Sequence, residues 1–286
     1  MARKENLKAY LFLAPALVLA SIFLFLPLIK AFASSFLRIS QGGNVLGFAG
    51  VSNYARLFSD KGFLNALGNT AKYIALFVPL NTAATLLAAT LTRRRRRFTS
   101  SLELVFASPI AISLASYCLI FKEMFRGKVS VVNRLLSLDV DWLSERFPAL
   151  MTLAILGVFL DFGLDYLLLT ASFRSIDKDI LDAARLDGAS DRQVYSKIEL
   201  PLIKRMLITT ILIALKDALM ISSPIIILTE GGPFRSTETV MFYYYIEAFK
   251  SGNRAIQNSL SVLMTMLFIA FMAIYAKRRG KDEKLL

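Results

Sequence analysis

Six long apolar blocks alternate with polar segments along this 286-residue chain, of which 56% is hydrophobic. A helix crosses a hydrocarbon core of roughly 30 Å with about 20 apolar residues, and each block reaches that length. Backbone groups cannot stay unpaired in lipid, so the blocks predict helices. The predicted spans are 9–29, 70–91, 102–121, 149–171, 202–228 and 255–276, with possible kinks at Pro79, Asn81 and Pro109. The pattern therefore predicts an all-α integral membrane protein, with one transmembrane domain over residues 1–286.

A polar interval, residues 175–201, lies between the fourth and fifth predicted spans. Asp177 opens a predicted helix, because acidic groups suit the positive end of a helix dipole. Gly188 ends it, because glycine readily takes the left-handed conformation of a helix C-cap. Ser190 and Gln193 have the spacing of a capping box, which predicts a second helix. The interval is expected to be an amphipathic elbow of two short helices, a pattern that an ordinary surface loop also fits.

Basic residues are unevenly distributed among the segments between the predicted spans. They lie at the N-terminus (Arg3, Lys4, Lys8), between the second and third spans (93–97), between the fourth and fifth (Arg174, Lys178, Arg185, Arg192, Lys197, Lys204, Arg205) and at the C-terminus (Lys277, Arg278, Arg279, Lys281, Lys284). All fall on one side if the spans alternate, so the positive-inside rule predicts cytoplasmic termini and a cytoplasmic elbow. This asymmetry explains most of the net charge of +13 in a protein of the lipid bilayer, so no nucleic-acid partner is needed to account for it.

The residues typical of a catalytic or metal centre are missing from the sequence. There is no histidine, which removes the commonest metal ligand and general base, and the single cysteine, Cys118, lies inside the third predicted span. No phosphate-binding loop of the G-x-x-x-x-G-K-[ST] type occurs. We therefore expect no cofactor, no metal and no ATPase site in this chain. If ATP drives the protein, another chain binds it.

Charged residues inside the predicted spans are candidates for a buried site. Asp161 and Asp165 are four residues apart and share one face of the fourth span, and Lys216 lies at comparable depth in the fifth. A charge at that depth costs roughly 3 kcal/mol or more unless it is paired or faces water. Either carboxylate pairs with Lys216 to fix helix packing, or these groups line a solute pathway, where carboxylates accept hydrogen bonds from sugar hydroxyls. An ion-coupled secondary transporter would use the same three residues as ion sites.

Two motifs give the chain a family resemblance. Asp182-Ala183-Ala184, Asp187-Gly188-Ala189 and Ile198-Glu199-Leu200-Pro201 resemble the EAA loop of the membrane subunits of binding-protein-dependent ABC importers. Thr229-Glu230-Gly231-Gly232-Pro233, followed by a tyrosine-rich stretch, resembles an external turn of the carbohydrate class, which includes the maltooligosaccharide and glycerol-phosphate permeases. Asp182 stands where the family has Glu, and Asp177 stands where it usually has Pro.

The resemblance implies the type I ABC importer permease fold, with six transmembrane helices and both termini cytoplasmic, in the inner or plasma membrane of a prokaryote. It implies import of a sugar or related small polar solute. The implied partners are a cytoplasmic ABC ATPase dimer, a second and homologous permease subunit, and an extracytoplasmic solute-binding protein. The residues implied in ATPase coupling are Asp182, Ala183, Ala184, Asp187, Gly188, Ile198 and Pro201. Those implied in contact with the binding protein are Thr229, Gly231, Gly232 and Pro233.

Overall fold

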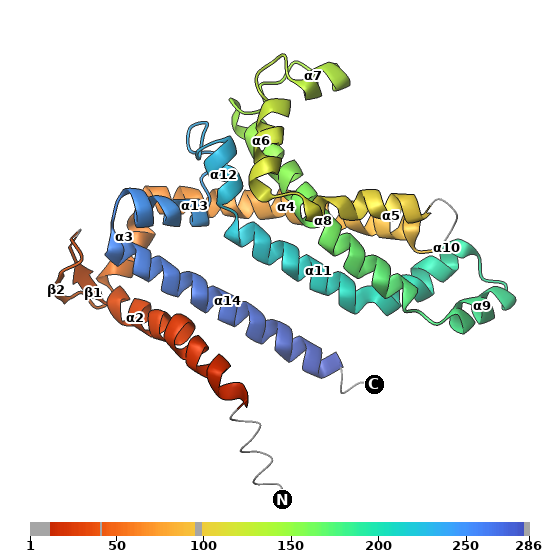
Figure 1. Ribbon diagram of the computed structural model, residues 1–286, viewed down its shortest axis with the longest axis horizontal. Helices are drawn as coiled ribbons and strands as arrows, with labels where there is room; N and C mark the ends of the chain where they lie inside the picture. Colours follow the sequence, from red (N-terminus) through yellow and green to blue (C-terminus); the bar gives the residue numbers. More distant parts are fainter. Residues whose placement is uncertain (1–11, 41, 95–98, 283–286) are drawn as a thin grey trace, which may run out of the picture. The chain divides into compact units, whose positions relative to one another are not determined.

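The computed structural model describes residues 12–40, 42–94 and 99–282 (Figure 1). Some residues used in the sequence analysis lie outside this part, namely 9–11 of the first predicted span, Arg3, Lys4, Lys8, 95–97 and Lys284. The chain forms two compact units, one made of the residues up to Leu64 and from Tyr244 onward, the other of Asn65–Tyr243. The second unit contains the elbow, the charged residues of the predicted spans and the Gly-Gly-Pro turn, so it carries the candidate sites.

The first unit pairs an N-terminal helix with the C-terminal helix. Its elements are the helix of 12–20, its π-helical continuation η1 (Ser21–Phe25), α2 (Leu26–Ser35), β1 (Leu37–Ile39), β2 (Val45–Phe48), α3 (Ser52–Ser59), η4 (Ile246–Lys250) and α14 (Arg254–Asp282). α2 packs along α14, and β1 pairs antiparallel with β2 (Figure 1). The side-chain amide of Asn53 donates to the carbonyls of Ser35 at 2.8 Å and Leu37 at 3.0 Å. Asn53 therefore ties α3 to the junction between α2 and the hairpin.

The second unit is a bundle of helices around α8. Its elements are α4 (Lys61–Thr92), which begins in the first unit, α5 (Thr99–Ala107), η2 (Ser108–Ala111), α6 (Leu114–Met124), α7 (Val131–Leu136), α8 (Arg146–Arg174), α9 (Lys178–Leu186), α10 (Asp191–Val194), η3 (Tyr195–Glu199), α11 (Leu200–Met220), α12 (Ser223–Leu228) and α13 (Val240–Tyr245), which ends in the first unit. α8 contacts α5, α6, α11 and α12. One buried core gathers residues from α4, α8 and α11, namely Ala88, Ala89, Tyr166, Leu169, Phe173 and Ile203. Ile176, Tyr195 and Leu200 pack against this core, so it supports the elbow.

The long helices are those of a multipass membrane protein. By length and composition, four can cross a membrane: Phe12–Ser35, Lys61–Thr92, Arg146–Arg174 and Arg254–Phe271. A fifth span results if α5 and α6, which are bent by 102° against each other, are counted together. α11 is long enough to cross a membrane but too polar to be counted with these spans, because four of its 21 residues are charged, namely Lys204, Arg205, Lys216 and Asp217.

The third predicted span, 102–121, is interrupted rather than continuous. Pro109 lies in the 3₁₀ turn η2, where α5 ends, and the chain becomes extended at Ile112. Ser113 then caps α6, since its Oγ accepts a hydrogen bond from the Ser116 amide at 3.3 Å. Proline lacks the N–H that a continuing helix needs, so the kink expected at Pro109 is confirmed as a full break.

The fifth predicted span, 202–228, is also broken, and the prediction of one continuous helix was wrong. α11 ends at Met220, and α12 begins at Ser223 with Pro224 in its first turn. Proline is accommodated in the first turn of a helix, where its missing N–H has no intrahelical acceptor, and not in a helix interior, so a new helix starts here. α4, by contrast, continues through Pro79 without a break.

Candidate functional site

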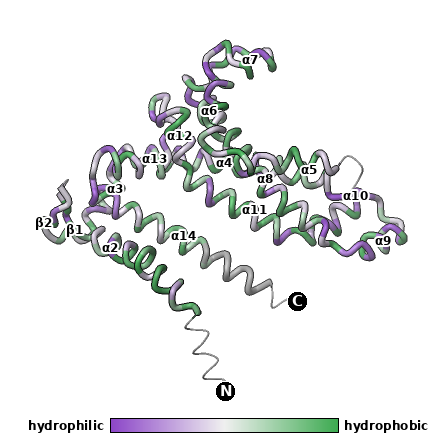
Figure 2. Tube along the Cα trace, in the orientation of Figure 1, coloured by the Kyte–Doolittle hydropathy of each residue, from purple (hydrophilic) through white to green (hydrophobic). Residues whose placement is uncertain are grey.

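The elbow joins α8 to α11 and consists of α9, a turn at Gly188, α10 and η3. It is largely hydrophilic, whereas α8 and α11 are rich in hydrophobic residues (Figure 2). Asp177 caps α9 by accepting a hydrogen bond from the Asp179 amide at 3.0 Å. Ser190 and Gln193 form the capping box of α10, in which each backbone amide donates to the other side chain, at 2.8 and 3.4 Å. The two helices predicted for this interval are confirmed.

Gly188 makes the turn between α9 and α10 in the left-handed conformation, with φ +87°. The Ala189 amide donates to the Ala184 carbonyl and the Gly188 amide to the Arg185 carbonyl, both at 3.0 Å. These two bonds are the Schellman arrangement that closes a helix C-terminus. A Cβ added at Gly188 would meet no atom within 4 Å, so the backbone conformation, and not packing, requires glycine here.

Arg94, after the end of α4, binds the start of α10. It donates to both carboxylate oxygens of Asp191, at 2.7 and 3.4 Å. The hydrogen bond from Arg94 and its positive charge hold the pKa of Asp191 below its ordinary value. Because the pKa is lower in the folded state, the pair stabilises the elbow at every pH above the unfolded aspartate pKa of about 4. This stabilisation is lost as the pH falls further, through the folded-state pKa.

Arg93 makes a second link between α4 and the elbow. Its Nε lies 3.0 Å from Glu199 Oε2, and the Glu199 side chain is only 4% exposed. The guanidinium also lies over the ring of Tyr195, at 4.9 Å from the centroid. The Tyr195 hydroxyl is 3.0 Å from Thr90 Oγ1. Nothing in the spacing of 106 positions indicates that Arg93 and Glu199 meet, so the sequence alone indicated only a role in topology for Arg93 and only a place in the EAA-like motif for Glu199.

The residues predicted for ATPase coupling lie on the outside of the elbow. Asp182, Ala183, Asp187, Gly188 and Pro201 are exposed, and Ala184 and Ile198 are half-buried. Apolar side chains on α9 are exposed as well, since Leu186 is 89% and Ile180 48% exposed. An apolar surface rimmed by charged groups is typical of a site that binds another protein. The role of these residues in coupling stays a prediction.

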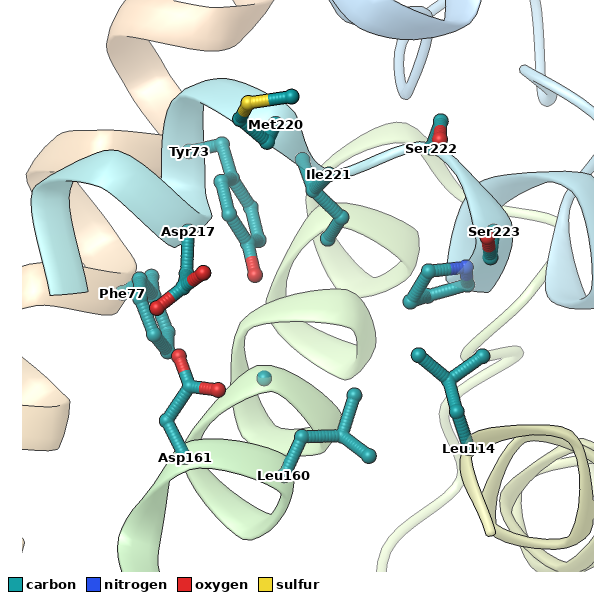
Figure 3. Close-up of a pocket in the computed structure, with 12 residues that line it drawn as sticks. Tyr73, Phe77, Leu114, Leu160, Asp161, Asp217, Met220, Ile221, Ser222 and Ser223 are labelled. Carbon is teal, nitrogen blue, oxygen red and sulfur yellow. The ribbon is translucent and has the colours of Figure 1, made fainter. Parts of the chain in front are cut away.

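A second candidate site is a cavity of about 180 Å³ within the helices of the second unit (Figure 3). Asp161 of α8 and Asp217 of α11 turn their carboxylates toward each other at one side of it, and Tyr73 of α4 points its hydroxyl toward the same space. Ser222 and Ser223 line it at the break between α11 and α12. Asp161 therefore faces a cavity, as the solute-pathway hypothesis requires. Asp217 and Tyr73 were not candidates from the sequence, because their approach to Asp161 depends on how three helices pack.

Asp165 and Lys216 have partners other than those proposed from the sequence. Asp165 is 1% exposed, and its Oδ2 accepts a hydrogen bond from Asn81 Nδ2 at 2.6 Å. Lys216 Nζ lies 2.6 Å from Oδ1 of its neighbour Asp217. In the part of the chain that the structure describes, no ion pair joins Asp161 or Asp165 to Lys216. The inter-helix ion pair, one of the two alternatives drawn from the sequence, is not formed, since Asn81 of α4 binds Asp165 and Lys216 pairs with its neighbour Asp217.

Replacing Asn81 by leucine is expected to destabilise the fold by about 2 kcal/mol or more, because it leaves the buried Asp165 carboxylate without its donor. Replacing both residues by leucine should restore most of that stability, since the unpaired charge is then gone. Unfolding of the purified chain by sodium dodecyl sulfate in mixed micelles, followed by circular dichroism, measures the difference. A single variant as stable as the wild type would contradict the assigned role of Asn81.

The Gly-Gly-Pro turn follows α12 and is held by threonine hydroxyls. Thr229 Oγ1 lies 2.8 Å from Thr237 Oγ1, which in turn donates to the Gly232 carbonyl at 2.6 Å. Gly231 has φ +86° and is buried, and a Cβ there would lie 2.7 Å from the ring of Phe242. The turn and the elbow lie at opposite ends of the connected helices α11 and α12 (Figure 1).

The exposed residues of this region are Glu230 within the turn and the segment just after the turn. Thr229, Gly232 and Pro233 are half-buried, whereas Phe234 is 80% exposed and lies under the guanidinium of Arg146 at 5.1 Å. The contact of Thr229, Gly231, Gly232 and Pro233 with a binding protein stays a prediction, and Phe234 adds an exposed aromatic side chain next to them. Phe234 was not a candidate from the sequence, because its exposure depends on the fold of the turn.

These features define a class of protein: a multipass helical membrane protein whose polar groups form an outer elbow and an inner cavity, as in a transport subunit. The chain belongs to the family described as the binding-protein-dependent transport system inner membrane component, whose model matches residues 81–277. The resemblance drawn from the two sequence motifs is thereby confirmed. The family favours a subunit of a binding-protein-dependent system over an ion-coupled secondary transporter.

Several permease proteins are similar to this chain over nearly its whole length. It is 28% identical to the lactose transport system permease protein LacF of Rhizobium radiobacter, over 98% of this chain and 97% of that one. It is 28% identical to the trehalose/maltose transport system permease protein MalF of Thermococcus litoralis, over 96% and 94%. It is 27% identical to the sn-glycerol-3-phosphate transport system permease protein UgpA of Agrobacterium fabrum, over 92% of each.

The fold is similar to that of a solved transporter chain. A chain from the crystal structure of a bacterial ABC transporter involved in the import of the acidic polysaccharide alginate matches with a TM-score of 0.83 at 20% identity, over 96% of both chains. A chain from the alginate transporter in complex with its alginate pentasaccharide-bound periplasmic protein matches with a TM-score of 0.82, also at 20% identity. The fold is thus that of an ABC importer permease.

Proposed function

We propose that this chain is the permease subunit of an ATP-driven importer that moves a sugar or a related small polar solute across the inner membrane of a prokaryote. The observation that carries the proposal is the elbow. It is a capped pair of helices with exposed apolar side chains, Ile180 and Leu186, at the junction of α8 and α11. The lactose and trehalose/maltose permeases among its relatives support the solute class.

Six spans with both termini in the cytoplasm are part of this proposal. Four of the six are the uninterrupted apolar helices. The other two are the bent pair of α5 and α6, which is third in chain order, and α11 together with α12, which is fifth. The charges of α11 are compatible with this role. Lys204 and Arg205 lie at its elbow end, where long basic side chains reach the interface, and Lys216 is paired with Asp217.

In the proposed mechanism, the elbow transmits motion from a separate ATPase to the membrane helices. α9 docks into a groove on the ATPase, and approach of the two ATPase subunits moves α8 and α11, which flank the elbow. The fixed turn at Gly188 and the links from Arg93 and Arg94 to η3 and α10 keep the elbow from moving independently of α4. The cavity between the helices then opens in turn to either side. The complete transporter also contains the ATPase dimer, a second and homologous permease, and an extracytoplasmic binding protein. The binding protein contacts this chain at the Gly-Gly-Pro turn.

Isolation of the complex tests the proposal. The tagged chain, extracted from its native membrane in mild detergent, is expected to carry an ABC ATPase and a second permease, and the reconstituted complex to import a labelled sugar only with ATP and the binding protein. Asp182→Ala, on the exposed face of α9, should weaken recovery of the ATPase. Asp139→Ala, an exposed carboxylate in the loop between α7 and α8, is the control and should not. Recovery of the chain alone, with transport driven by an ion gradient, would contradict the proposal.

A further inference from the structure

The cavity of the second unit is built to keep polar groups free for a ligand. Tyr73 is 2% exposed, its ring stacks on that of Phe77 with the centroids 5.4 Å apart, and its hydroxyl points toward the cavity (Figure 3). A buried hydroxyl is normally hydrogen-bonded. The Tyr73 hydroxyl makes no hydrogen bond with another described residue and lies at the lining of the cavity. A buried donor aimed at a cavity without a protein acceptor is a group available to a solute.

Gly157 of α8 allows the two rings to occupy this position. A Cβ at Gly157 would lie 2.4 Å from the Tyr73 hydroxyl oxygen and 2.9 Å from the ring of Phe77. Any larger residue would push the aromatic pair away from α8. The sequence at this point of α8 therefore preserves both the aromatic wall and the free hydroxyl.

The charges that face the cavity are acidic. Asp161 and Asp217 line it, and Asp161 has no hydrogen bond or ion pair with another described residue. Asp165, one turn from Asp161, is a third carboxylate and is bound to Asn81. The nearby cation is Lys216, which is paired with Asp217 and is not part of the lining. An ionised solute with a negative charge would meet carboxylates here and no free cation.

We propose that this cavity is a solute-contacting site that accepts uncharged or cationic sugars and rejects anionic ones such as uronates and sugar phosphates. The proposal rests on the importer function proposed above and deepens it. Asp161 accepts hydrogen bonds from sugar hydroxyls or an ammonium group, since ionised carboxylates are acceptors only. The Tyr73 hydroxyl donates to a sugar oxygen, and the stacked Tyr73 and Phe77 rings form an apolar wall. Asp161, Asp217 and Tyr73 are the residues that determine this specificity.

Charged thiol reagents test the electrostatics of the cavity without knowledge of the solute. Cys118 is the only cysteine, so Cys118→Ala with Leu160→Cys, a lining position, gives one thiol in the cavity. The labelling ratio is the rate with the cationic trimethylammonioethyl methanethiosulfonate divided by the rate with the anionic sulfonatoethyl reagent. In the reconstituted complex, this ratio at Leu160→Cys should be at least about tenfold higher than the ratio at the reference site, Leu135→Cys on exposed α7. The ratio should fall at high salt, which screens the carboxylates.

Asp161→Asn is the variant that separates an electrostatic role from a structural one. It removes a charge without breaking a described bond. The labelling ratio should therefore fall to within about threefold of the ratio at Leu135→Cys, and uptake should discriminate less against a uronate disaccharide. Tyr73→Phe should raise the KM for a neutral disaccharide by about threefold to tenfold and leave the labelling ratio unchanged, since it removes one neutral hydrogen bond. Asp139→Asn, on an exposed carboxylate, is the matched control.

The outcomes separate this inference from the importer function. A complex that imports sugar but labels equally fast with both reagents, or that takes up uronates as well as neutral sugars, would overturn the inference and leave the importer function standing. A complex that imports no sugar would overturn the importer function and the assignment of a sugar to the cavity, whatever the labelling ratio. Unchanged uptake selectivity in Asp161→Asn would assign the carboxylate to packing.

Discussion

Sugar uptake by the assembled transporter is expected to fall at least about tenfold when Gly188 is replaced by valine. Gly188 has φ +87°, a conformation that costs an L-residue about 1–2 kcal/mol and a β-branched residue more. Each 1.4 kcal/mol is a tenfold change in population, so the Schellman turn would mostly give way to another conformation. α9 would then leave α8 at a different angle, and its contact with the ATPase would be lost or would no longer transmit motion.

Uptake, ATPase activity and recovery of the ATPase in a pull-down are the three measurements for Gly188→Val. Gly188→Asn should retain most activity, because asparagine tolerates the left-handed conformation. Gly127→Val is a matched control, since Gly127 also has a positive φ, +65°, and open space around its Cβ, but lies between α6 and α7. Uptake and coupling in Gly188→Val equal to those of Gly127→Val would sink the assignment of the elbow to coupling.

Breaking the ion pair between Arg93 and Glu199 is expected to destabilise the chain by about 3 kcal/mol. The side chains are 17% and 4% exposed, so removal of one partner leaves the other charge largely buried. Arg93→Met also removes the contact with the Tyr195 ring, which is a further reason for a large effect. The loss would fall on the junction of α4, η3 and α11, where the elbow is anchored.

A double-mutant cycle of Arg93→Met and Glu199→Met measures this interaction. The double variant should be more stable than the sum of the single changes predicts, because neither charge is then left buried alone. Glu123→Gln is the control, since Glu123 and Arg126 form an exposed pair at 3.4 Å whose loss should cost about 0.5 kcal/mol or less. Sodium dodecyl sulfate unfolding in mixed micelles compares all four. Additive effects of the two single variants would contradict an energetically coupled pair.

The anionic solutes of two relatives give the inferred charge selectivity a direct contrast. The solved neighbour takes part in the import of alginate, an acidic polysaccharide, and UgpA belongs to a transport system for sn-glycerol 3-phosphate. Binding of such anions requires a cation or a set of oriented donors at the site. The cavity of this chain presents Asp161 and Asp217 instead.

Local sequence signals predicted the elements of the elbow accurately. Asp177, Gly188 and the pair of Ser190 with Gln193 act within four residues of the groups they satisfy, so their effect can be read without knowing the fold. Apolar block length likewise located the long helices, because a membrane span is defined by its own composition. The breaks at Pro109 and Pro224 also have local causes: a kink at Pro109 was expected, whereas the length of the apolar block of 202–228 obscured the break at Pro224.

Tertiary packing alone decided which polar groups meet. Asp165 binds Asn81 across 84 positions, Arg93 binds Glu199 across 106, and Asp161 shares a cavity with Asp217 and Tyr73. The sequence by itself identified Asp161, Asp165 and Lys216 as costly charges in need of partners, because an unpaired charge in an apolar span is unfavourable in any fold. Which partner each acquired depended on the rotation and depth of neighbouring helices, and these are set by the packing of side chains far apart in the chain.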